Sequence, residues 1–218
     1  MPFIKKISSE AGILGIWELL ETVESLLEIF CFSEKEQSEF NKINIDKRRI
    51  EYLSVRLLLE KLLNFKPDII YNEQGKPRLT NYHQNISISH SSEVVTVIVS
   101  EKTIGIDAEN SERNIGKIAH RFLSINELNY LEKAKTPQSA KIIYWSAKEA
   151  IFKCSGLQVF RFNEQINIQP FEIKEEGKFY GTLKQNDNIL SFSLWYFFYK
   201  NNVIVYCVEN LNSEHEKS

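Results

Sequence analysis

Cysteine is scarce in this chain of 218 residues. Cys31, Cys154 and Cys207 are widely spaced, their number is odd, and no C-x-x-C pair occurs. This pattern argues against a disulfide framework, and with only 4 histidines it argues against a structural zinc site as well. We therefore expect reduced thiols and a cytoplasmic location.

An excess of one charge sign is also missing. The 27 Lys and Arg residues are matched by 29 Asp and Glu residues, so the net charge is −2 and the pI is about 6.2. Proteins that bind nucleic acid through its backbone are usually basic, so we expect no nucleic-acid partner. An anionic ligand would have to be bound by a local cluster of basic groups.

Long apolar runs are absent too. The segment ILGIWELL, residues 13–20, is fairly apolar, but Glu18 lies inside it and Glu10, Glu21 and Glu24 flank it. We therefore expect neither a signal peptide nor a membrane partner. With 43% hydrophobic and 26% charged residues, the composition is typical of a packed soluble protein.

The apolar spacing predicts an α+β fold made of two similar lobes. Each half of the chain reads as helical segments followed by a small antiparallel sheet, with 85–109 as a three-strand meander and 94–99 buried on both faces. The predicted units are residues 1–108, residues 109–210 and a disordered tail, 211–218. The predicted helices are 22–32, 45–64, 116–134 and 137–154, and the predicted strands are 13–19, 85–90, 94–99, 103–109, 166–174, 178–185, 189–200 and 202–209.

Two carboxylates stand out in GIDAE, residues 105–109. Asp107 and Glu109 are two positions apart on a predicted strand, so they share a face, while Ile106 and Ala108 point into a core. Such a pair can converge on a hard cation such as Mg²⁺. The alternative is that both line the polar face of an edge strand.

A second group occurs in WSAKEAIFK, residues 145–153. Trp145, Glu149 and Lys153 follow each other at four-residue intervals, so they share one face of a helix. The alternative to a functional role is an ordinary exposed Glu149–Lys153 ion pair, which contributes less than about 0.5 kcal/mol.

The basic and imidazole side chains form a third group. His90 lies among hydroxyls in SISHSS, and each of these residues taken singly fits a turn residue or a solvated surface charge. The basic residues are Arg48, Arg49, Arg56, Lys76 and Arg78.

The order of these motifs is more specific than any one of them. A basic helix, G-K-P, I-S-H-S, G-I-D-x-E, F-L-S-x-x-E and W-S-A-K-E-A-x-x-K succeed each other over residues 47–153. The chain thereby resembles the 4′-phosphopantetheinyl transferase superfamily, in the two-lobed class that activates surfactin and enterobactin synthetases. The resemblance implies a monomeric enzyme with its site between the lobes. It would transfer phosphopantetheine from coenzyme A to a serine of an apo acyl or peptidyl carrier protein and release 3′,5′-ADP.

The resemblance also implies roles for the acidic motifs. Asp107 and Glu109 would bind Mg²⁺, directly or through water. Glu149 would be a third metal ligand or the general base for the carrier serine. Lys153 would pair with the diphosphate, and Lys148 would add to that positive field.

The other motif residues would bind the coenzyme. Lys76 and His90 match positions that bind its phosphates, and Ser89 could donate a hydrogen bond to a phosphate. Arg48 and Arg56 match the basic helix that flanks the nucleotide.

Several points stay open at this stage. Glu127 matches a motif glutamate near the metal and the pantetheine, but it fits a helix N-terminal carboxylate equally well. Glu36 and Gln37 stand where many relatives carry a basic residue, and after Lys153 only Ser155-Gly156-Leu157 remains of a longer glycine-rich run. The alternatives to a transferase are a homologue that binds coenzyme A or a carrier protein without catalysis, and a Mg²⁺-dependent phosphohydrolase.

Overall fold

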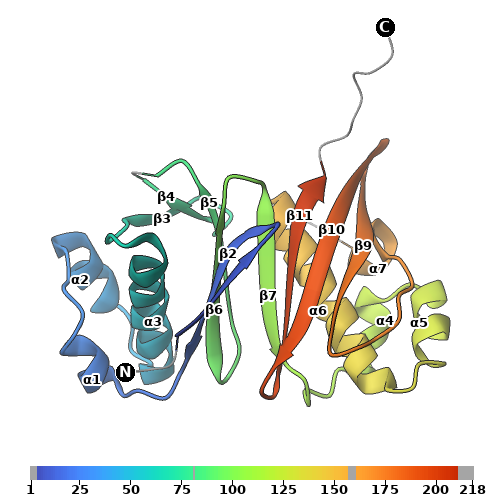
Figure 1. Ribbon diagram of the computed structural model, residues 1–218, viewed down its shortest axis with the longest axis horizontal. Coiled ribbons are helices and arrows are strands. Elements are labelled where there is room, and N and C mark those ends of the chain that lie inside the picture. The colour runs from blue at the N-terminus through green and yellow to red at the C-terminus, as the bar shows by residue number, and fades with distance from the viewer. Residues whose placement is uncertain (1–3, 81, 157–160, 211–218) are drawn as a thin grey trace, which may run out of the picture.

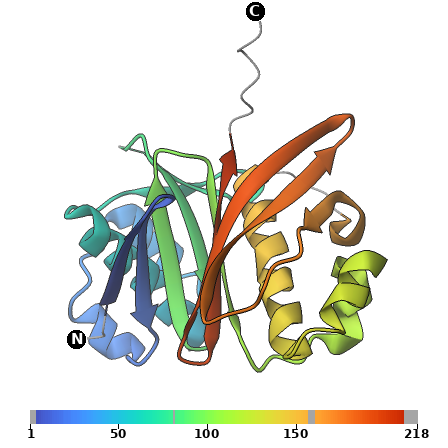
Figure 2. The same ribbon diagram turned by 45° about the vertical axis from the view of Figure 1, so that its right-hand side comes forward.

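The structure is a computed structural model, and it describes residues 4–80, 82–156 and 161–210. Two antiparallel sheets pack face to face, and helices cover the outer face of each, so the layers are helix, sheet, sheet, helix (Figure 1). Figure 2 shows a long helix lying along the second sheet. The predicted α+β fold with two similar lobes is confirmed.

The first sheet has the order β1-β2-β6-β5-β4-β3. Its central strand, β6, is buried along its whole length, as the sequence predicted. The strands are β1 (Ile4–Ser9), β2 (Gly12–Glu18), β3 (Ile69–Tyr71), β4 (Pro77–Leu79), β5 (Asn85–His90) and β6 (Val94–Ser100). The sequence pattern had not indicated β1.

Three helices lie on the outer side of this sheet, and α3 packs directly against it: α1 (Val23–Leu27), α2 (Glu34–Phe40) and α3 (Asp46–Leu63). The prediction of one helix over 22–32 and another over 45–64 is confirmed in part, since the first is shorter and α2 follows it. In α3, Leu53, Leu58 and Leu62 pack on β2 and β6 in one apolar cluster. The helix ends at Asn64, which takes the left-handed conformation with φ 61°.

The second sheet has the order β7-β11-β10-β9-β8. The prediction for 166–174 is too long, because only its first three residues form a strand. The strands are β7 (Ile104–Asn110), β8 (Ile166–Ile168), β9 (Glu176–Gln185), β10 (Asn188–Tyr199) and β11 (Asn202–Asn210).

The helices of this half are η1 (Gly116–Ile118), α4 (Ala119–Phe122), α5 (Ile125–Leu131), α6 (Pro137–Ser155) and α7 (Phe162–Gln165). The prediction for 137–154 is confirmed by α6, which ends at Gly156 with φ 68°. The single helix predicted over 116–134 is wrong. It breaks at Leu123, because Ser124 caps a new helix through a reciprocal capping box with Glu127.

The meander predicted over 85–109 is also wrong. β7 pairs with β11 of the second sheet, and both edges of β6 are already paired, with β2 and β5. The outer edge of β7 instead donates to side chains of β5: Ile106 N to Ser87 Oγ at 3.0 Å and Ala108 N to Ser89 Oγ at 3.2 Å. These hydroxyls satisfy an edge that would otherwise hold buried unpaired N–H groups.

The change of sheet therefore falls between Ser100 and Ile104. The division into residues 1–108 and 109–210 stays a prediction, and the predicted tail, 211–218, lies outside the described residues. Between the sheets, Ile106 and Ala108 pack with Leu14 and Ile98, so these two residues face a core as expected.

Within the described ranges, every helix is too short or too polar to cross a lipid bilayer.

A buried ion pair joins α5 to α6. Lys148 Nζ lies 2.7 Å from Glu127 Oε2 and donates to the carbonyls of Phe162 and Ile166, and the lysine side chain is fully buried. Glu127 also accepts from the backbone N–H groups of Ser124 and Ile168. Burial lowers the pKa of Lys148, and the neighbouring Glu127 carboxylate opposes that shift.

We predict that Gly105→Ala destabilises the fold. A Cβ at this position would collide with the carbonyl oxygen of Ala150 and lie 2.8 Å from the backbone nitrogen of Cys154, both in α6. Overpacking of this kind lowers the free energy of unfolding by about 1–3 kcal/mol. Urea denaturation of the purified variant measures the change. Gly116→Ala is the control, because its Cβ meets only Asn114 Oδ1 at 3.4 Å, and equal stability of the two variants would contradict the prediction.

We predict a larger loss for Lys148→Met. This change leaves the Glu127 carboxylate buried without its counter-charge, which costs about 3–5 kcal/mol of unfolding free energy. The double variant Lys148→Met/Glu127→Gln should recover part of the loss because no lone charge remains. Thermal melting compares both with Lys133→Met on the exposed surface, and a Lys148→Met melting temperature equal to that control would refute the role.

Candidate functional site

The candidate site lies where α6 packs on the face of β7. Trp145 Nε1 donates to Glu109 Oε1 at 3.0 Å. Further along α6, Lys153 Nζ lies 2.8 Å from Asp107 Oδ1. Glu149 is midway between Trp145 and Lys153 on the same face of α6. Side chains spaced four residues apart on α6 thus face side chains spaced two residues apart on β7. Each set shares one face of its element, as the sequence predicted.

The three carboxylates of this site interact electrostatically. Burial raises the pKa of Glu149 to about 7, and the negative charges of Asp107 and Glu109 add to that shift, while Lys153 opposes it. A carboxyl group that titrates near neutrality can hold or release a proton under physiological conditions.

Asp107 is the most buried of the three, with 5% of its surface exposed. Its Oδ1 receives hydrogen bonds from both Ser89 Oγ, at 3.0 Å, and Lys153, whereas its Oδ2 is buried without a hydrogen-bond partner among the described residues. Asp107 therefore lies on an edge strand, as its alternative interpretation had it, but its side chain is buried rather than solvated. Glu109 is more exposed and also pairs with Arg113, at 2.5 Å.

Lys153 does not form the exposed i,i+4 ion pair that was the alternative for the helix motif. Its ammonium group reaches across to Asp107 and Ser89, and the lysine stands beside Glu149 as part of one charged cluster.

A divalent metal ion fits the chemistry of these donors. Within the described ranges, no three Asp, Glu, His or Cys side chains are gathered closely enough to enclose a metal ion as they stand. However, oxygen donors on facing elements suit Mg²⁺, which takes few carboxylates and keeps several waters, and Asp107 Oδ2 is an unpartnered oxygen of this kind. The metal-ligand roles of Asp107, Glu109 and Glu149 remain a prediction.

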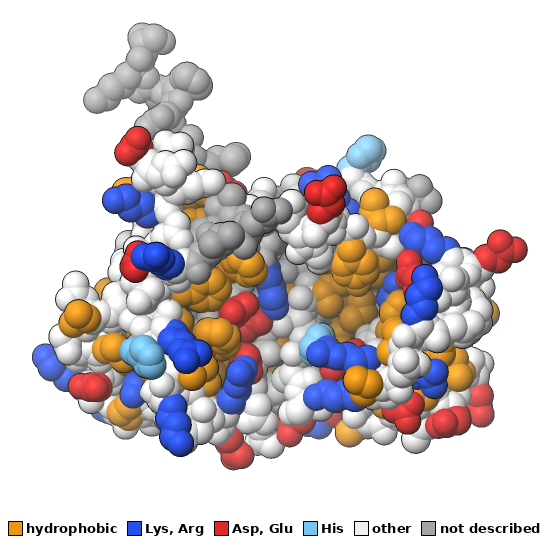
Figure 3. Space-filling model, turned by 180° about the vertical axis from the view of Figure 1, so that it is seen from behind, with side chains coloured by type: hydrophobic (Ala, Val, Ile, Leu, Met, Phe, Trp, Pro, Cys, Tyr) orange, Lys and Arg blue, Asp and Glu red, His pale blue; other side chains and the backbone are white. Residues whose placement is uncertain are grey.

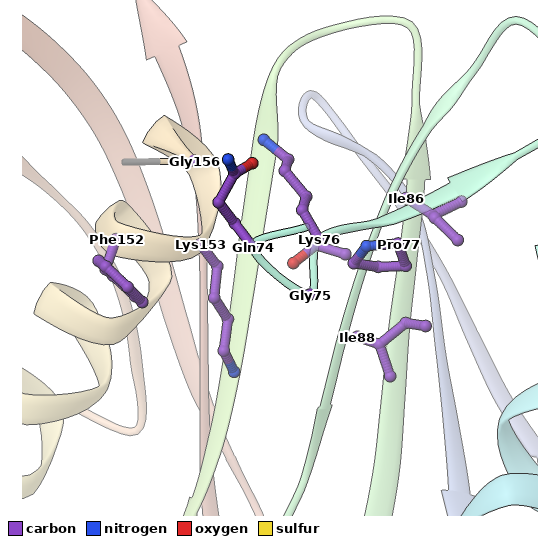
Figure 4. A pocket seen from close by; sticks show the side chains of 10 residues that line it. Gln74, Gly75, Lys76, Pro77, Ile86, Ile88, Phe152, Lys153 and Gly156 are labelled. Atoms are coloured by element: carbon purple, nitrogen blue, oxygen red, sulfur yellow. The ribbon is translucent and has the colours of Figure 1, made fainter. Parts of the chain in front are cut away.

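Two neighbouring cavities open beside this cluster and share Gly75, Pro77 and Ile88. Figure 3 shows the hollow between the two halves of the molecule, where acidic, basic and apolar side chains meet. The first cavity, of about 220 Å³, lies between the loop before β4 and the end of α6, and Lys76, Phe152 and Lys153 line it (Figure 4). The second, of about 490 Å³, lies between α3 and the end of β5.

Lys76 connects the two halves at the first cavity. Its Nζ donates to the carbonyl oxygen of Cys154 at 2.8 Å, near the end of α6 where carbonyl groups carry partial negative charge. The end of α6 thus holds the Lys76 ammonium group, and the phosphate-binding role of Lys76 stays a prediction.

The second cavity brings together Arg48 and His90, two predicted coenzyme ligands. Arg48 Nη1 lies 3.2 Å from His90 Nε2 and 2.7 Å from Glu51 Oε2. Sequence analysis did not single out Glu51, although its position three residues after Arg48 on a helix is a signal for a side-chain pair.

Arg56 also lines this cavity, but its charge is already compensated. It is 4% exposed, lies 3.1 Å from Glu39 and 3.5 Å from Glu36, and stacks on the Tyr52 ring. Glu36, noted for replacing a basic residue of relatives, is therefore part of the cluster that neutralises Arg56.

Lys148 and Glu127 lie off this site. The expectation that Lys148 adds to the positive field at the diphosphate is wrong, because its ammonium group is fully buried against Glu127 on another face of α6. The structure favours the helix N-terminal interpretation of Glu127, since its carboxylate closes the capping box of α5.

Comparison with known proteins bears on this arrangement. Residues 103–207 match the family model of the 4′-phosphopantetheinyl transferase superfamily. That range contains β7, α6 and most of β11, and it includes all three carboxylates and Lys153.

Curated relatives agree with the family match. The chain is 30% identical over 115 residues to the 4′-phosphopantetheinyl transferase AcpT of Salmonella typhimurium, across 50% of this chain and 60% of that protein. It is 31% identical over 131 residues to the 4′-phosphopantetheinyl transferase gsp of Aneurinibacillus migulanus, across 56% and 55%. It is 29% identical over 144 residues to the 4′-phosphopantetheinyl transferase psf-1 of Bacillus pumilus, across 62% and 61%.

The aligned part of the chain thus spans little more than half the length of these relatives. The resemblance carried by the sequence motifs is nevertheless confirmed, since the matched residues include the G-I-D-x-E and W-S-A-K-E-A-x-x-K motifs. Residues 103–207 of this chain are therefore similar to the 4′-phosphopantetheinyl transferase superfamily.

Proposed function

We propose that the protein transfers the 4′-phosphopantetheine group of coenzyme A to a serine of an apo acyl or peptidyl carrier protein and releases 3′,5′-ADP. The observation that supports this most is the meeting of Asp107, Glu109 and Glu149 with Lys153, beside a cavity that Lys76 borders. Carboxylates for a metal and ammonium groups for phosphates are what phosphoryl transfer requires.

In this proposal the serine oxygen attacks the β-phosphorus of coenzyme A. A new P–O bond forms to the serine, and the bond from that phosphorus to the oxygen bridging the diphosphate breaks, so the electron pair leaves with 3′,5′-ADP. Mg²⁺ held by Asp107, Glu109 and Glu149 would neutralise charge on the phosphoryl oxygens. Lys153 would do the same from the side of α6.

The serine proton needs an acceptor near the metal ligands. Glu149 is suited to receive it, because its raised pKa of about 7 is close to that of a general base working at neutral pH. Its alternative role is that of a metal ligand alone, with the proton passed to water.

The coenzyme would lie along the two joined cavities. Lys76, Ser89 and His90 would bind its phosphates, and Arg48 would flank the nucleotide from α3. Arg56 would support this wall rather than pair with a phosphate, since Glu36 and Glu39 already compensate it. We further propose a monomer that acts in the cytoplasm.

The transfer itself is the first test. We expect the full chain, incubated with coenzyme A, Mg²⁺ and an apo carrier protein, to increase the carrier's mass by one phosphopantetheine group in intact-protein mass spectrometry. Fatty-acid, polyketide and nonribosomal-peptide carriers are compared in one panel. No mass gain on any carrier, together with tight coenzyme A binding, would favour a non-catalytic homologue, and 3′,5′-ADP release without a carrier would favour a phosphohydrolase.

We expect Glu149→Gln to lower the transfer rate by at least about 100-fold, because loss of a general base or a metal ligand removes that much catalysis. The variant keeps the size of the side chain, so its melting temperature should stay close to that of the unchanged protein. Asp187→Asn, in the exposed turn after β9, is the matched control. A Glu149→Gln rate equal to that control would exclude Glu149 from the site.

Metal removal gives an independent prediction. Dialysis against EDTA should abolish transfer, and added Mg²⁺ should restore it, because the carboxylate cluster needs a cation to approach an anionic diphosphate. Undiminished transfer in excess EDTA would contradict a role for the metal ion in transfer. The role of the Lys153 charge would then still have to be tested.

A further inference from the structure

Glu51 is a buried carboxylate that faces the second cavity, although no motif includes it. Its side chain is 6% exposed and belongs to α3. Oε2 accepts a hydrogen bond from Arg48 Nη1, whereas Oε1 is buried without a hydrogen-bond partner among the described residues. A buried carboxylate oxygen left unpaired is costly, so its orientation needs an explanation.

That oxygen points at His90. Glu51 Oε1 lies 3.4 Å from His90 Nδ1, longer than a good hydrogen bond but within ion-pair distance. The other ring nitrogen, Nε2, lies 3.2 Å from Arg48 Nη1. Since a guanidinium nitrogen can only donate, Nε2 acts here as the acceptor, which places the single ring proton on Nδ1, towards Glu51.

The imidazole is therefore neutral while Arg48 occupies Nε2. Burial lowers the pKa of His90, and the positive charges of Arg48 and Lys47 on α3 and of Lys153 on α6 lower it further; the Glu51 carboxylate opposes these effects. A phosphate entering the cavity changes this balance, because it attracts the Arg48 guanidinium and adds negative charge beside the ring.

We propose that Glu51 is a positioning residue that orients the His90 ring through Nδ1. When coenzyme A binds, Nε2 takes up a proton and donates a hydrogen bond to a phosphate group of the coenzyme. The inference rests on the proposed function, since coenzyme A supplies the phosphate. In the free protein, the positive charge of Arg48 and the negative charge of Glu51 compensate each other. In the complex, the imidazolium adds one positive charge that faces the ligand.

This arrangement predicts a measurable uptake of protons when coenzyme A binds. Binding of coenzyme A takes up a fraction of one proton, so the affinity falls as pH rises, by at most about tenfold for each pH unit. Measurements between pH 7 and 8.5 stay above the second pKa of a phosphomonoester, which is about 6, so the ligand itself changes charge little.

Isothermal titration calorimetry of the full chain with coenzyme A tests the inference, with Mg²⁺ present and in buffers of different ionisation enthalpy. We expect wild-type proton uptake and a Kd that weakens with pH. Glu51→Gln should weaken binding at pH 7 by about tenfold, as for loss of a charge-assisted interaction, and should remove most of the uptake. Glu60→Gln, on the same helix but outside the cavity, should behave like the unchanged protein.

His90→Asn supplies the second arm, because His90 is partly exposed and its replacement should not prevent folding. This variant should also lose the proton uptake, and adding Glu51→Gln to it should change Kd little further. Wild-type uptake that survives in either variant overturns the inference, as does weaker binding of Glu51→Gln with uptake unchanged. If the unchanged protein binds no coenzyme A at all, the proposed function fails and the inference fails with it.

Discussion

The site depends on how closely α6 approaches the edge strand β7. Gly105 makes this approach possible, because any side chain there would collide with the backbone of α6. Two residues along the strand, Asp107 comes within reach of Lys153, and Glu109 reaches Trp145. A single glycine therefore determines how close the carboxylates of the strand lie to the side chains of the helix.

The edge of β7 has a second constraint, since it must be satisfied without a neighbouring strand. Hydroxyls of Ser87 and Ser89 accept its N–H groups, and Ser89 also donates to Asp107. The connection between the two sheets is thus partly polar at the point where the ligand is proposed to bind. Lys153 donates to both Asp107 and Ser89 at this point.

Much of the fold and part of the site could be predicted from sequence. The periodicity of α3 and α6 and the fully buried run of β6 are local patterns, so they were read correctly. The shared face of Asp107 and Glu109 follows from strand geometry alone. The pairing of β7 could not be inferred, because the same alternating pattern suits a meander and an edge strand of another sheet.

The sequence by itself determined the residue types, their spacing and the family resemblance, because motif order is a property of the chain. The tertiary structure decided which charges are free to act. Lys148 and Lys153 are five residues apart on one helix, yet one is buried against Glu127 and the other reaches Asp107. Arg56 is compensated by glutamates of α2, and Glu51 stands behind His90. Such pairings join residues distant in the chain, and burial makes them strong, so only the packed molecule reveals them.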